Sequence, residues 1–578
     1  MMTVLADIAR LAKLCIGGPG GRLGLVYFIA IVALGLIGVR VGIQLITWNA
    51  DFYNALQKLD VPAALHQIGV YFGLTAITAA LHLASTYLRR QLQIRWRHAL
   101  TEAALERWLA GKAYWHLRDR TENGLDNPDQ RIAEDCRIFV DKLTDEALEL
   151  ITKIVGLISY VAILWSLSTF PLAFALAGLS VEVPRYMVWA APVYVAIATL
   201  ITHGLGAPLK RLDGEQQRRE ADFRFALTRL RENVEPVALA SGEAAERGLL
   251  AQRFAALAGN WHQLARRELI LGLFSRPYFQ TVLTMPMFLA LPAYLAGRVT
   301  FGGLMQIRSA FQNVVTTLSW FIFSYKDLAQ LAATASRLGH FLDAAEAAAA
   351  LAPQPAVAAS PDDRLRLRQI ALSTPAGRAL APLPALDFSP GEACWLRAPS
   401  GHGKSTLVKA LAGLWRHGAG RIERPAGSIA FLPQQAYLPL GSLAAALAYP
   451  ARAADFSDED YRAALAAVGL PGLWTRDEAV WLQARHGLSG GERQRLALAR
   501  LHLHKPGWAV LDEATSALDS EAERQVLAAL RAALPMTGFI VIAHRAPEGI
   551  GPDRIIDLVA AEAAGVPDDV SASLERVG

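Results

Sequence analysis

Long apolar stretches dominate the first half of the chain, whereas short apolar runs alternate with amphipathic stretches in the second half. The first stretch, 23–48, is interrupted by Arg40 and is too long for the apolar core of a signal peptide. Each stretch approaches the ~20 residues that a helix needs to cross the hydrocarbon core. The pattern therefore predicts six membrane-spanning helices, at 23–48, 66–88, 149–170, 184–206, 277–297 and 301–325.

Lys and Arg are concentrated on one side of these predicted spans. The N-terminal flank and the long connections 89–148 and 209–267 are basic, whereas the loops 49–65 and 171–183 carry far fewer Lys and Arg. Because basic loops tend to stay in the cytoplasm, we expect the N-terminus, both connections and the C-terminal half there. Apolar residues recur at helical spacing within 209–266, so the spanning helices should continue beyond the membrane; solvated loops are the alternative.

From residue 363 onward the pattern is typical of an α/β domain, with short apolar runs between helical stretches. An alanine-rich segment, with Pro353, Pro355 and Pro361 in or just after it, precedes this change. The sequence therefore predicts a transmembrane domain at 1–340, a linker at 341–362 and an α/β domain at 363–578.

Composition supports a chain that is part membrane protein and part soluble domain. Hydrophobic residues make up 53% and charged residues 19%, against about 25% charged in an ordinary soluble domain. This excludes a disordered or collagen-like chain. The net charge of +5 comes without a basic cluster, which argues against a nucleic-acid partner. The three cysteines lie far apart and make no disulfide framework.

A glycine-bearing loop follows one of the apolar strands of the second half and precedes an amphipathic helix. Phosphates bind where backbone N–H groups converge at a helix N-terminus and the side chains are small. Lys404 would neutralise β/γ-phosphate charge, Ser405 would hold Mg²⁺, and Ala398 replaces the usual first glycine of such a loop. The candidate nucleotide-binding residues are Ser400, Gly401, His402, Gly403, Lys404, Ser405 and Thr406.

Two further apolar runs end in residues that suit a hydrolytic site. The run 508–511 is followed by Asp512, placed to orient Mg²⁺, and by Glu513, placed to polarise an attacking water. The run 539–543 is followed by His544, which would contact the γ-phosphate and the water. Solvated strand-end acids and a structural histidine are the alternatives.

A second anion site is predicted where a helix begins near residue 490. A serine and two glycines at a helix start favour an anion. One nucleotide does not need two such sites in one domain, so the second site would complete the pocket of another copy of the chain. A simple helix cap is the alternative. The residues concerned are Ser489, Gly490 and Gly491.

These motifs occur in the order and spacing of ABC-transporter ATPase domains, and the resemblance covers nearly all of 363–550. It implies that Gln434 is the loop glutamine that senses Mg²⁺ and the membrane domain, and that Asp519 contacts the second copy. The aromatic residue that usually stacks on adenine is missing, and 373–375 (Ser-Thr-Pro) occupy its region. The implied catalytic residues are Glu513, His544 and Gln434, and the implied Mg²⁺ residues are Ser405, Gln434 and Asp512.

The chain resembles subfamily D ABC half-transporters at 125–135 and 231–243 in the membrane half and at 411–415 in the ATPase half. That group includes peroxisomal fatty-acyl and lysosomal cobalamin carriers, and bacterial relatives of the SbmA/BacA type that handle peptides, bleomycin or cobalamin. The resemblance implies an all-α, six-helix, exporter-like (type IV) transmembrane domain followed by an α/β P-loop ABC ATPase domain.

The resemblance further implies an ABC-type translocase that hydrolyses ATP with Mg²⁺. Two identical or closely related half-transporters would work together in a lipid bilayer, the bacterial inner membrane, with both ATPase domains in the cytoplasm. The expected substrate is amphipathic or bulky: a peptide, a cobalamin-like compound or an acyl compound. An ATP-gated channel or regulatory receptor is the alternative. Candidate residues for the substrate path are Arg40, Gln280, Gln306, Arg308 and Asn313.

Overall fold

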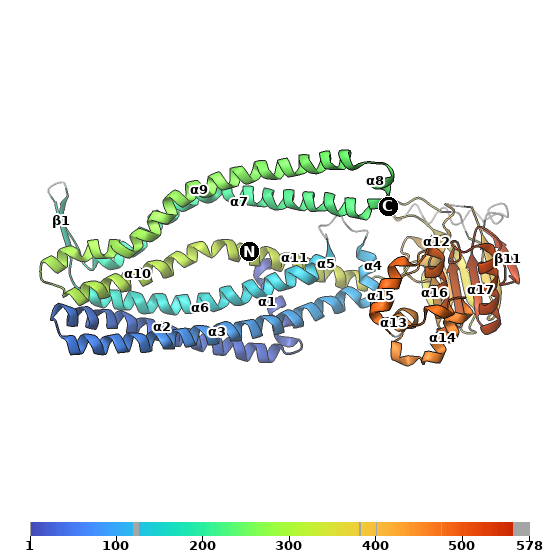
Figure 1. The fold of residues 1–578 in the computed structure, drawn as a ribbon, viewed down its shortest axis with the longest axis horizontal. Coiled ribbons are helices and arrows are strands. Elements are labelled where there is room, and N and C mark those ends of the chain that lie inside the picture. Colours follow the sequence, from blue (N-terminus) through green and yellow to red (C-terminus); the bar gives the residue numbers. More distant parts are fainter. Residues whose placement is uncertain are drawn as a thin grey trace. The chain divides into compact units, whose positions relative to one another are not determined.

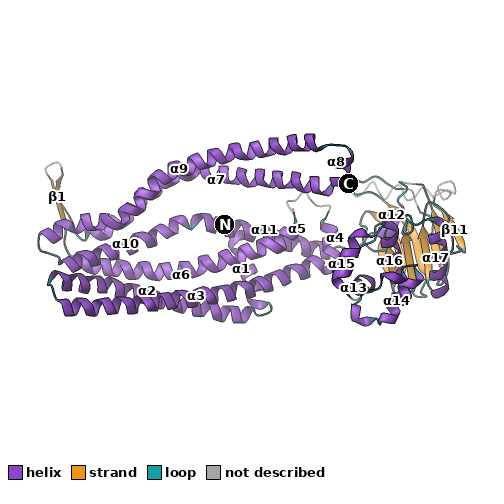
Figure 2. Cartoon of the chain, viewed as in Figure 1, coloured by secondary structure: helices purple, strands orange, loops and turns teal. Residues whose placement is uncertain are grey.

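The computed structural model describes residues 2–118, 127–176, 179–380, 383–399, 401–475 and 477–558. The chain forms two compact units, Met1–Ala349 and Ala350–Gly578. The first unit is almost entirely helical and the second contains the two larger sheets (Figures 1 and 2).

Long helices build the first unit, and a two-stranded antiparallel hairpin, β1 (Leu172–Leu176) with β2 (Leu179–Val183), connects α6 to α7. Asp60 caps the start of α3 by accepting a hydrogen bond from the backbone N–H of Ala63. The helices are α1 (Met2–Gly17), α2 (Gly21–Gln57), α3 (Val61–Leu109), α4 (Ala113–Leu117), α5 (Pro128–Gln130), α6 (Cys136–Leu167), α7 (Tyr186–Glu232), α8 (Val234–Leu239), α9 (Glu243–Leu295), α10 (Phe301–Phe323) and α11 (Tyr325–Ala349).

Five of the described helical segments are long and apolar enough to cross a membrane. They are Gly21–Gln57, Val61–Leu117, Pro128–Leu167, Tyr186–Glu232 and Glu243–Leu295, and each contains one of the first five predicted spans almost entirely. The sixth predicted span forms α10, a helix of 23 residues that carries several polar side chains, Arg308 among them. The long connections 89–148 and 209–267 do extend the spanning helices, as the apolar spacing predicts.

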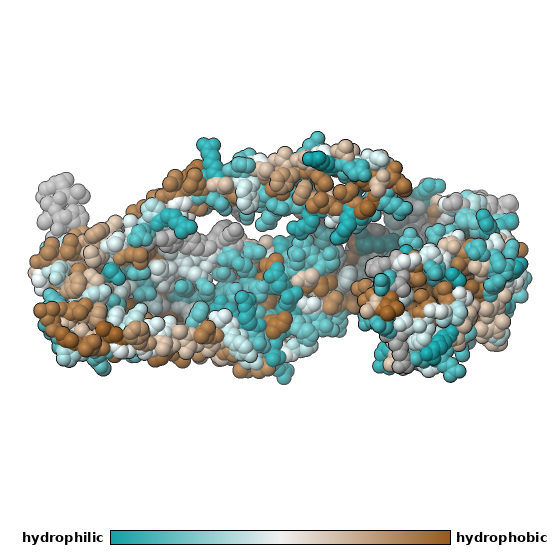
Figure 3. All heavy atoms as spheres, in the orientation of Figure 1, coloured by the Kyte–Doolittle hydropathy of each residue, from teal (hydrophilic) through white to brown (hydrophobic). Residues whose placement is uncertain are grey.

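Two hydrophobic clusters hold the first unit together. One joins α2, α6, α7, α9 and α10, with Phe311 fully buried, and the other joins α1, α2, α3, α6 and α11, with Phe139 fully buried. Helices α7 and α9 lie side by side and are connected at their tip by α8 (Figure 1). Apolar side chains gather around the α9–α10 turn, at the left of the view, and hydrophilic ones become frequent toward α4 and α5 (Figure 3).

A buried ion-pair cluster ties the start of α6 to α11. The carboxylate of Asp135 is 3% exposed and accepts from Arg337 Nε at 3.0 Å, from Arg337 Nη2 at 2.8 Å and from Arg131 Nη1 at 2.6 Å. A buried carboxylate needs such partners, because an unpaired charge there would be strongly destabilising.

Two sheets form the framework of the second unit. The parallel sheet has the order β11 (Arg554–Asp557), β6 (Ala393–Arg397), β10 (Gly538–Ile542), β9 (Trp508–Asp512) and β8 (Ile429–Leu432). The second sheet has the order β3 (Ala356–Ala359), β7 (Gly418–Arg424), β4 (Leu365–Leu372) and β5 (Leu386–Phe388). Every residue of β9 and β10 is buried, which explains why both read as unbroken apolar runs.

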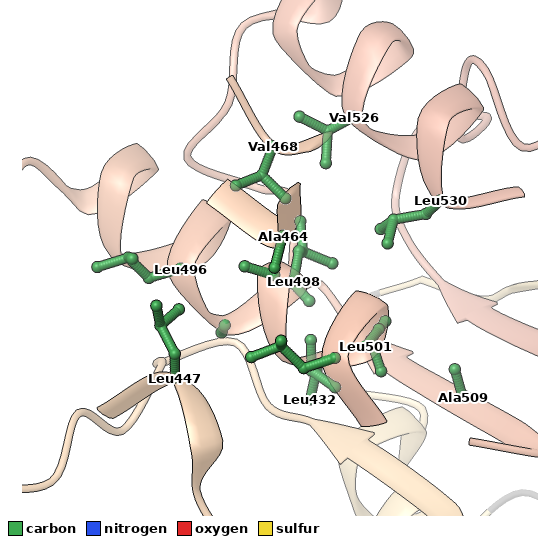
Figure 4. Close-up of a cluster of buried hydrophobic side chains, with 14 of the residues drawn as sticks. Leu432, Leu447, Ala464, Val468, Leu496, Leu498, Leu501, Ala509, Val526 and Leu530 are labelled. Atoms are coloured by element: carbon green, nitrogen blue, oxygen red, sulfur yellow. The ribbon is translucent and has the colours of Figure 1, made fainter. Parts of the chain in front are cut away.

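Helices cover the parallel sheet and enclose the larger hydrophobic core of this unit (Figure 4). Leu447, Ala464, Leu498 and Leu530 belong to this core and come from four different helices. The helices are α12 (Lys404–Leu411), α13 (Leu443–Ala448), α14 (Asp458–Ala467), α15 (Glu478–Gly487), α16 (Gly490–His504) and α17 (Ser520–Ala533).

The alanine-rich segment that the sequence marks as a linker contains regular structure at both ends. Helix α11 continues to Ala349, and β3 pairs in parallel with β7 from Ala356 onward. The division between the two units falls after Ala349.

Candidate functional site

The glycine-bearing loop lies between β6 and α12, in the strand–loop–helix order that the sequence predicts. Gly401 and Gly403 both have φ of 85°, a left-handed conformation that glycine adopts without a steric cost. Helix α12 begins at Lys404, directly after Gly403, so its free N–H groups face the loop. His402 belongs to the loop, and Ser405 and Thr406 lie in the first turn of α12. Ser400 lies outside the described residues.

Lys404 is a buried cation that contacts two of the predicted catalytic residues. Its side chain is 7% exposed, and its Nζ lies 3.5 Å from Glu513 Oε1 and 3.1 Å from His544 Nε2. His544 Nε2 is also 3.1 Å from the same carboxylate oxygen. Nζ donates a hydrogen bond to the carbonyl of Ala398 at 3.1 Å. The alanine that replaces the usual glycine therefore contributes its backbone oxygen to the position of the lysine.

Glu513 has a strained backbone at the end of β9. Its φ is 51°, which is uncommon for a residue with a side chain. Its N–H donates to the carbonyl of Ile542 at 2.9 Å, which holds the end of β9 beside the end of β10. Gln434 Nε2 donates to Glu513 Oε2 at 3.1 Å. Backbone strain within a polar cluster favours a functional site over a solvated strand end.

Asp512 lies beside the phosphate-binding loop and is 8% exposed. Burial raises the pKa of its carboxyl, a hydrogen bond with Ser405 lowers it, and the neighbouring Glu513 raises it. The net direction is upward because burial is the largest of these effects. The hydroxyl of Ser405 and the carboxylate of Asp512 thus present two adjacent oxygen ligands.

The second predicted anion site is the start of α16. In the structure, side chains of the same chain cap this helix. Ser489 and Glu492 form a reciprocal capping box: Glu492 N–H donates to Ser489 Oγ at 3.2 Å, and Ser489 N–H donates to Glu492 Oε2 at 2.8 Å. The Glu492 carboxylate also accepts from the hydroxyl of Ser489 at 2.8 Å, and the hydrogen bonds from the N–H and the hydroxyl of Ser489 lower the pKa of this carboxyl. A Cβ on Gly491 would lie 2.9 Å from the carbonyl of Ala517, so glycine permits this close approach, and Gly490 begins the helix beside it.

Asp519 also makes a local contact, because it caps α17 by accepting from Ala522 N–H at 2.8 Å. In the described part of the chain, neither Ser489 nor Asp519 hydrogen-bonds to the cluster of Lys404, Glu513 and His544. Their predicted contact with a second copy stays a prediction.

Gln494 is a site residue that the sequence analysis missed. It is 6% exposed, and its Nε2 donates to the carbonyl of Gln434 and to Ser516 Oγ, both at 3.2 Å. Its Oε1 accepts from Ala517 N–H at 2.9 Å. One side chain on α16 therefore fixes the loop that carries Gln434 and the turn that follows Glu513. The available signal was a glutamine on the helix face that otherwise carries Ala497, Leu498 and Leu501.

Family models match both units of the chain. The model of ABC transporter transmembrane region 2 matches residues 11–295, and the ABC transporter model matches residues 384–516. The inner membrane ABC transporter ATP-binding protein YddA of Escherichia coli (strain K12) is 34% identical over 536 residues, which cover 92% of this chain and 93% of that protein. The chain belongs to the ABC transporter family.

More distant ABC relatives cover most of the chain as well. The chloroplastic ABC transporter D family member 2 of Arabidopsis thaliana is 29% identical, over 89% of this chain and 80% of its own length. The human lysosomal cobalamin transporter ABCD4 is 27% identical, over 90% of this chain and 89% of its own. The structure of a bacterial Atm1-family ABC exporter with ATP bound shares the fold, with a TM-score of 0.71 at 18% identity and 93% coverage of both chains.

This ABC transporter is therefore a half-transporter with one ATP-binding unit and a membrane unit that shares the fold of the Atm1-family exporter. The resemblance to ABC transporters, including subfamily D half-transporters, is confirmed. An ABC ATPase domain implies ATP hydrolysis coupled to transport.

The polar residues proposed for the substrate path differ in location and burial in the structure. Asn313 on α10 lines a cavity among α2, α3, α6 and α10, together with residues that the sequence analysis did not single out. Arg308 on the same helix has a buried Nε without a hydrogen-bond partner in the described part of the chain. Arg40 and Gln280 are exposed, and Gln306 is partly buried. Part of the subfamily motif, residues 125 and 126, lies outside the described residues.

Proposed function

We propose that the chain is an ATP-hydrolysing ABC half-transporter that moves an amphipathic or bulky substrate, such as a peptide, a cobalamin-like compound or an acyl compound, across a bacterial inner membrane. The observation that carries this proposal is the convergence of Lys404, Gln434, Glu513 and His544 at the phosphate-binding loop. Four side chains from separate segments meet where a γ-phosphate and its attacking water would lie.

In this proposal each residue at the loop has a separate role in phosphoryl transfer. Lys404 neutralises phosphate charge, Glu513 accepts a proton from the attacking water, and His544 holds the carboxylate and the terminal phosphate in place. The residues present fit Mg²⁺, because Ser405, Gln434 and Asp512 offer oxygen ligands and Mg²⁺ prefers one or two carboxylates together with phosphate oxygens. The metal would neutralise charge that develops on the phosphates.

The functional unit in this proposal is a pair of identical chains. Each chain has a single ATPase unit, and the signature residues Ser489 to Gly491 would face the nucleotide held by the other copy. Exposed apolar side chains on the α7–α9 pair support this: Phe225 is 68% exposed and Trp261 is 56% exposed, and both lie beyond the predicted spans 184–206 and 277–297. Lipid cannot cover these residues there, so a second chain is the partner that we propose.

Motion would pass from the ATPase units to the spans through the helix tips. The tips that we propose for this role, from the sequence motifs, are residues 127–131 and 235–242. Closure on ATP and opening after hydrolysis would then alternate the access of the substrate path. The E. coli relative is named as an inner membrane protein, which supports a bacterial inner-membrane location with both ATPase units in the cytoplasm.

Reconstituted vesicles test this function. The purified protein is inserted into liposomes, and ATP-dependent movement of peptides, cobalamin and acyl compounds is measured in both directions. We expect one class to accumulate against its gradient with Mg·ATP, and Glu513→Gln to abolish accumulation. Flow only down a gradient would instead favour an ATP-gated channel. ATP hydrolysis at full rate by isolated single chains would refute the shared pocket.

Dimer contact has its own test. Phe225→Glu should weaken the association of the two chains, which cysteine cross-linking or native mass spectrometry would detect. Lys58→Gln is the control, because Lys58 is exposed at the end of α2 and its replacement changes charge away from the α7–α9 surface.

A further inference from the structure

A cavity of about 570 Å³ lies within the membrane unit, among α2, α3, α6 and α10. These four helices run side by side in Figure 1 and pack against one another. Helix α2 contributes mainly glycines, including Gly38, so the wall on that side carries little side-chain bulk. Apart from the glycines and Val39, every lining side chain carries a polar atom. The cavity is therefore unsuited to a hydrocarbon chain.

Basic groups outnumber acidic groups in this cavity. Three cations, Arg89, Arg90 and Lys153, line it together with two carboxylates, Asp145 and Glu149, which leaves an excess of one positive charge (3 − 2 = 1). Charged side chains at the end of membrane spans are costly unless they are paired or serve a ligand.

One of the cations is already paired. Arg89 Nη1 lies 3.2 Å from Asp145 Oδ1, and Gln93 Nε2 donates to the same oxygen at 3.2 Å. Arg90 Nη1 donates only to the neutral amide oxygen of Gln93, at 3.3 Å, among the hydrogen bonds of the described residues.

The remaining charges do not neutralise one another. Lys153 and Glu149 are four positions apart on α6, a spacing that often forms an ion pair. Within the described part of the chain, neither Lys153 nor Arg90 comes within ion-pair distance of Glu149 or Asp145. Arg90 also acts electrostatically on Asp141, which does not line the cavity, but neither Arg90 nor Lys153 has a carboxylate at ion-pair distance among the described residues.

We propose that this cavity binds an anionic group of the transported substrate, a carboxylate or a phosphate, between Arg90 and Lys153. Glu149 accepts a hydrogen bond from a neighbouring donor on the same molecule, and Arg89 stays with Asp145. Charge-assisted hydrogen bonds to an oxyanion are the strong interactions that such a pair of cations can make. The inference rests on the proposed transport function and specifies its substrate class: the part of the substrate held here is hydrophilic and negatively charged.

Binding of defined anions tests this site without requiring turnover. The full-length protein is placed in phosphatidylcholine nanodiscs with a saturating non-hydrolysable Mg·ATP analogue, so that all phosphate positions of the ATPase site are filled. Dihexanoylphosphatidic acid represents a lipid headgroup, inorganic phosphate represents a soluble anion, and dihexanoylphosphatidylcholine is the lipid without net charge. The dissociation constant is obtained from the shift of the thermal unfolding midpoint with concentration.

We expect at least one anion to bind more tightly than dihexanoylphosphatidylcholine. Lys153→Gln should weaken this binding on the order of tenfold, which corresponds to about 1.4 kcal/mol. Lys153→Arg, which keeps the charge, should retain it. Lys58→Gln is the matched control, because Lys58 is an exposed lysine at the end of α2 outside the cavity. Basal ATP hydrolysis should persist in Lys58→Gln, and an unchanged thermal unfolding midpoint without added anion shows that all three variants fold.

Each possible result of the binding experiment either supports or contradicts the proposed anion site. A response to phosphatidic acid alone assigns a lipid headgroup, and a response to phosphate assigns a soluble anion. Equal binding of the charged and uncharged ligands, or unchanged binding in Lys153→Gln, overturns the anion site. Failure of the wild-type protein to hydrolyse ATP would contradict the proposed function instead, because the binding measurement is independent of hydrolysis.

Discussion

Gln434 donates a hydrogen bond from Nε2 to Oε2 of Glu513 at 3.1 Å, although 79 positions separate the two residues in sequence. The loop glutamine and the predicted catalytic carboxylate therefore restrain each other directly. Lys404 and His544 contact the other oxygen of the same carboxylate. Both oxygens of Glu513 are thus held by neighbours, which fixes the direction in which the carboxylate can accept a proton.

Replacing this carboxylate should stop the chemical step and preserve binding. Glu513→Gln keeps the size of the side chain but removes the base, so we expect ATP hydrolysis to fall at least about 100-fold. Affinity for ATP should change by only a few-fold, because the loop and Lys404 are intact. Phosphate release and binding of a fluorescent ATP analogue measure the two effects. Glu521→Gln, on the exposed surface of α17, should hydrolyse ATP at the wild-type rate.

Gln494 should act as a positioning residue for two segments of the site. Gln494→Ala removes all three of its hydrogen bonds, and we expect kcat to fall about tenfold or more with little change in KM. Gln494→Glu keeps an acceptor for the N–H of Ala517 but removes both donors, so it should restore the thermal midpoint more than it restores kcat. Gln525→Ala, on exposed α17, is the control. Parallel loss of kcat and stability in both variants would indicate a purely structural role.

Asp512 should make the free energy of unfolding of the nucleotide-free protein decrease as the pH rises. Burial raises the pKa of this carboxyl in the folded chain, so the folded state binds more protons than the unfolded state between the two pKa values. The free energy of unfolding therefore falls as the pH rises through that interval. Asp512→Asn should unfold at a higher temperature than wild type near pH 8, and the difference should shrink as the pH is lowered. A variant less stable than wild type at both pH values would contradict this assignment.

The ion-pair cluster at Asp135 should be strongly coupled. Asp135→Asn leaves Arg131 and Arg337 without a charged partner, and we expect a loss of about 3 kcal/mol, at the low end for a broken buried pair because Arg337 is 42% exposed. Arg337→Gln added to Asp135→Asn should cost less than the sum of the single changes. Thermal unfolding of the four proteins measures the coupling, and strict additivity would argue against it.

Sequence patterns located the ATPase site because its chemistry depends on local order. Strand, loop and helix follow one another around Gly403 and Lys404, and Asp512 with Glu513 end an apolar run, so position along the chain predicts position in the fold. The roles of these residues remain predictions. Gln494 could not be found in this way, because its partners are a carbonyl 60 positions earlier and a turn 22 positions later.

The membrane cavity was harder to foresee for a different reason. The sequence places Arg89 and Arg90 in a basic connection and Lys153 at the start of a predicted span. Only the pairing of α3 with α6 brings these charges to one cavity, and that pairing depends on side-chain packing between helices rather than on spacing within one of them. The capping box at Ser489 was readable from the Ser-x-x-Glu spacing, but the sequence alone did not decide between a cap and an anion site.

Gly38 lines the cavity and has no side chain, so substitutions of increasing size at this position can reduce the volume of the cavity in steps. A Cβ at Gly38 would have no heavy atom within 4 Å, whereas one at Gly35 would collide with Thr152 Cγ2 at 2.4 Å. Alanine at position 38 would therefore fit without a clash, and valine and leucine would extend the side chain further from that point. Such a series would measure the size of the transported substrate. The first substitution that prevents transport would indicate the width of the portion of the substrate that lies beside α2.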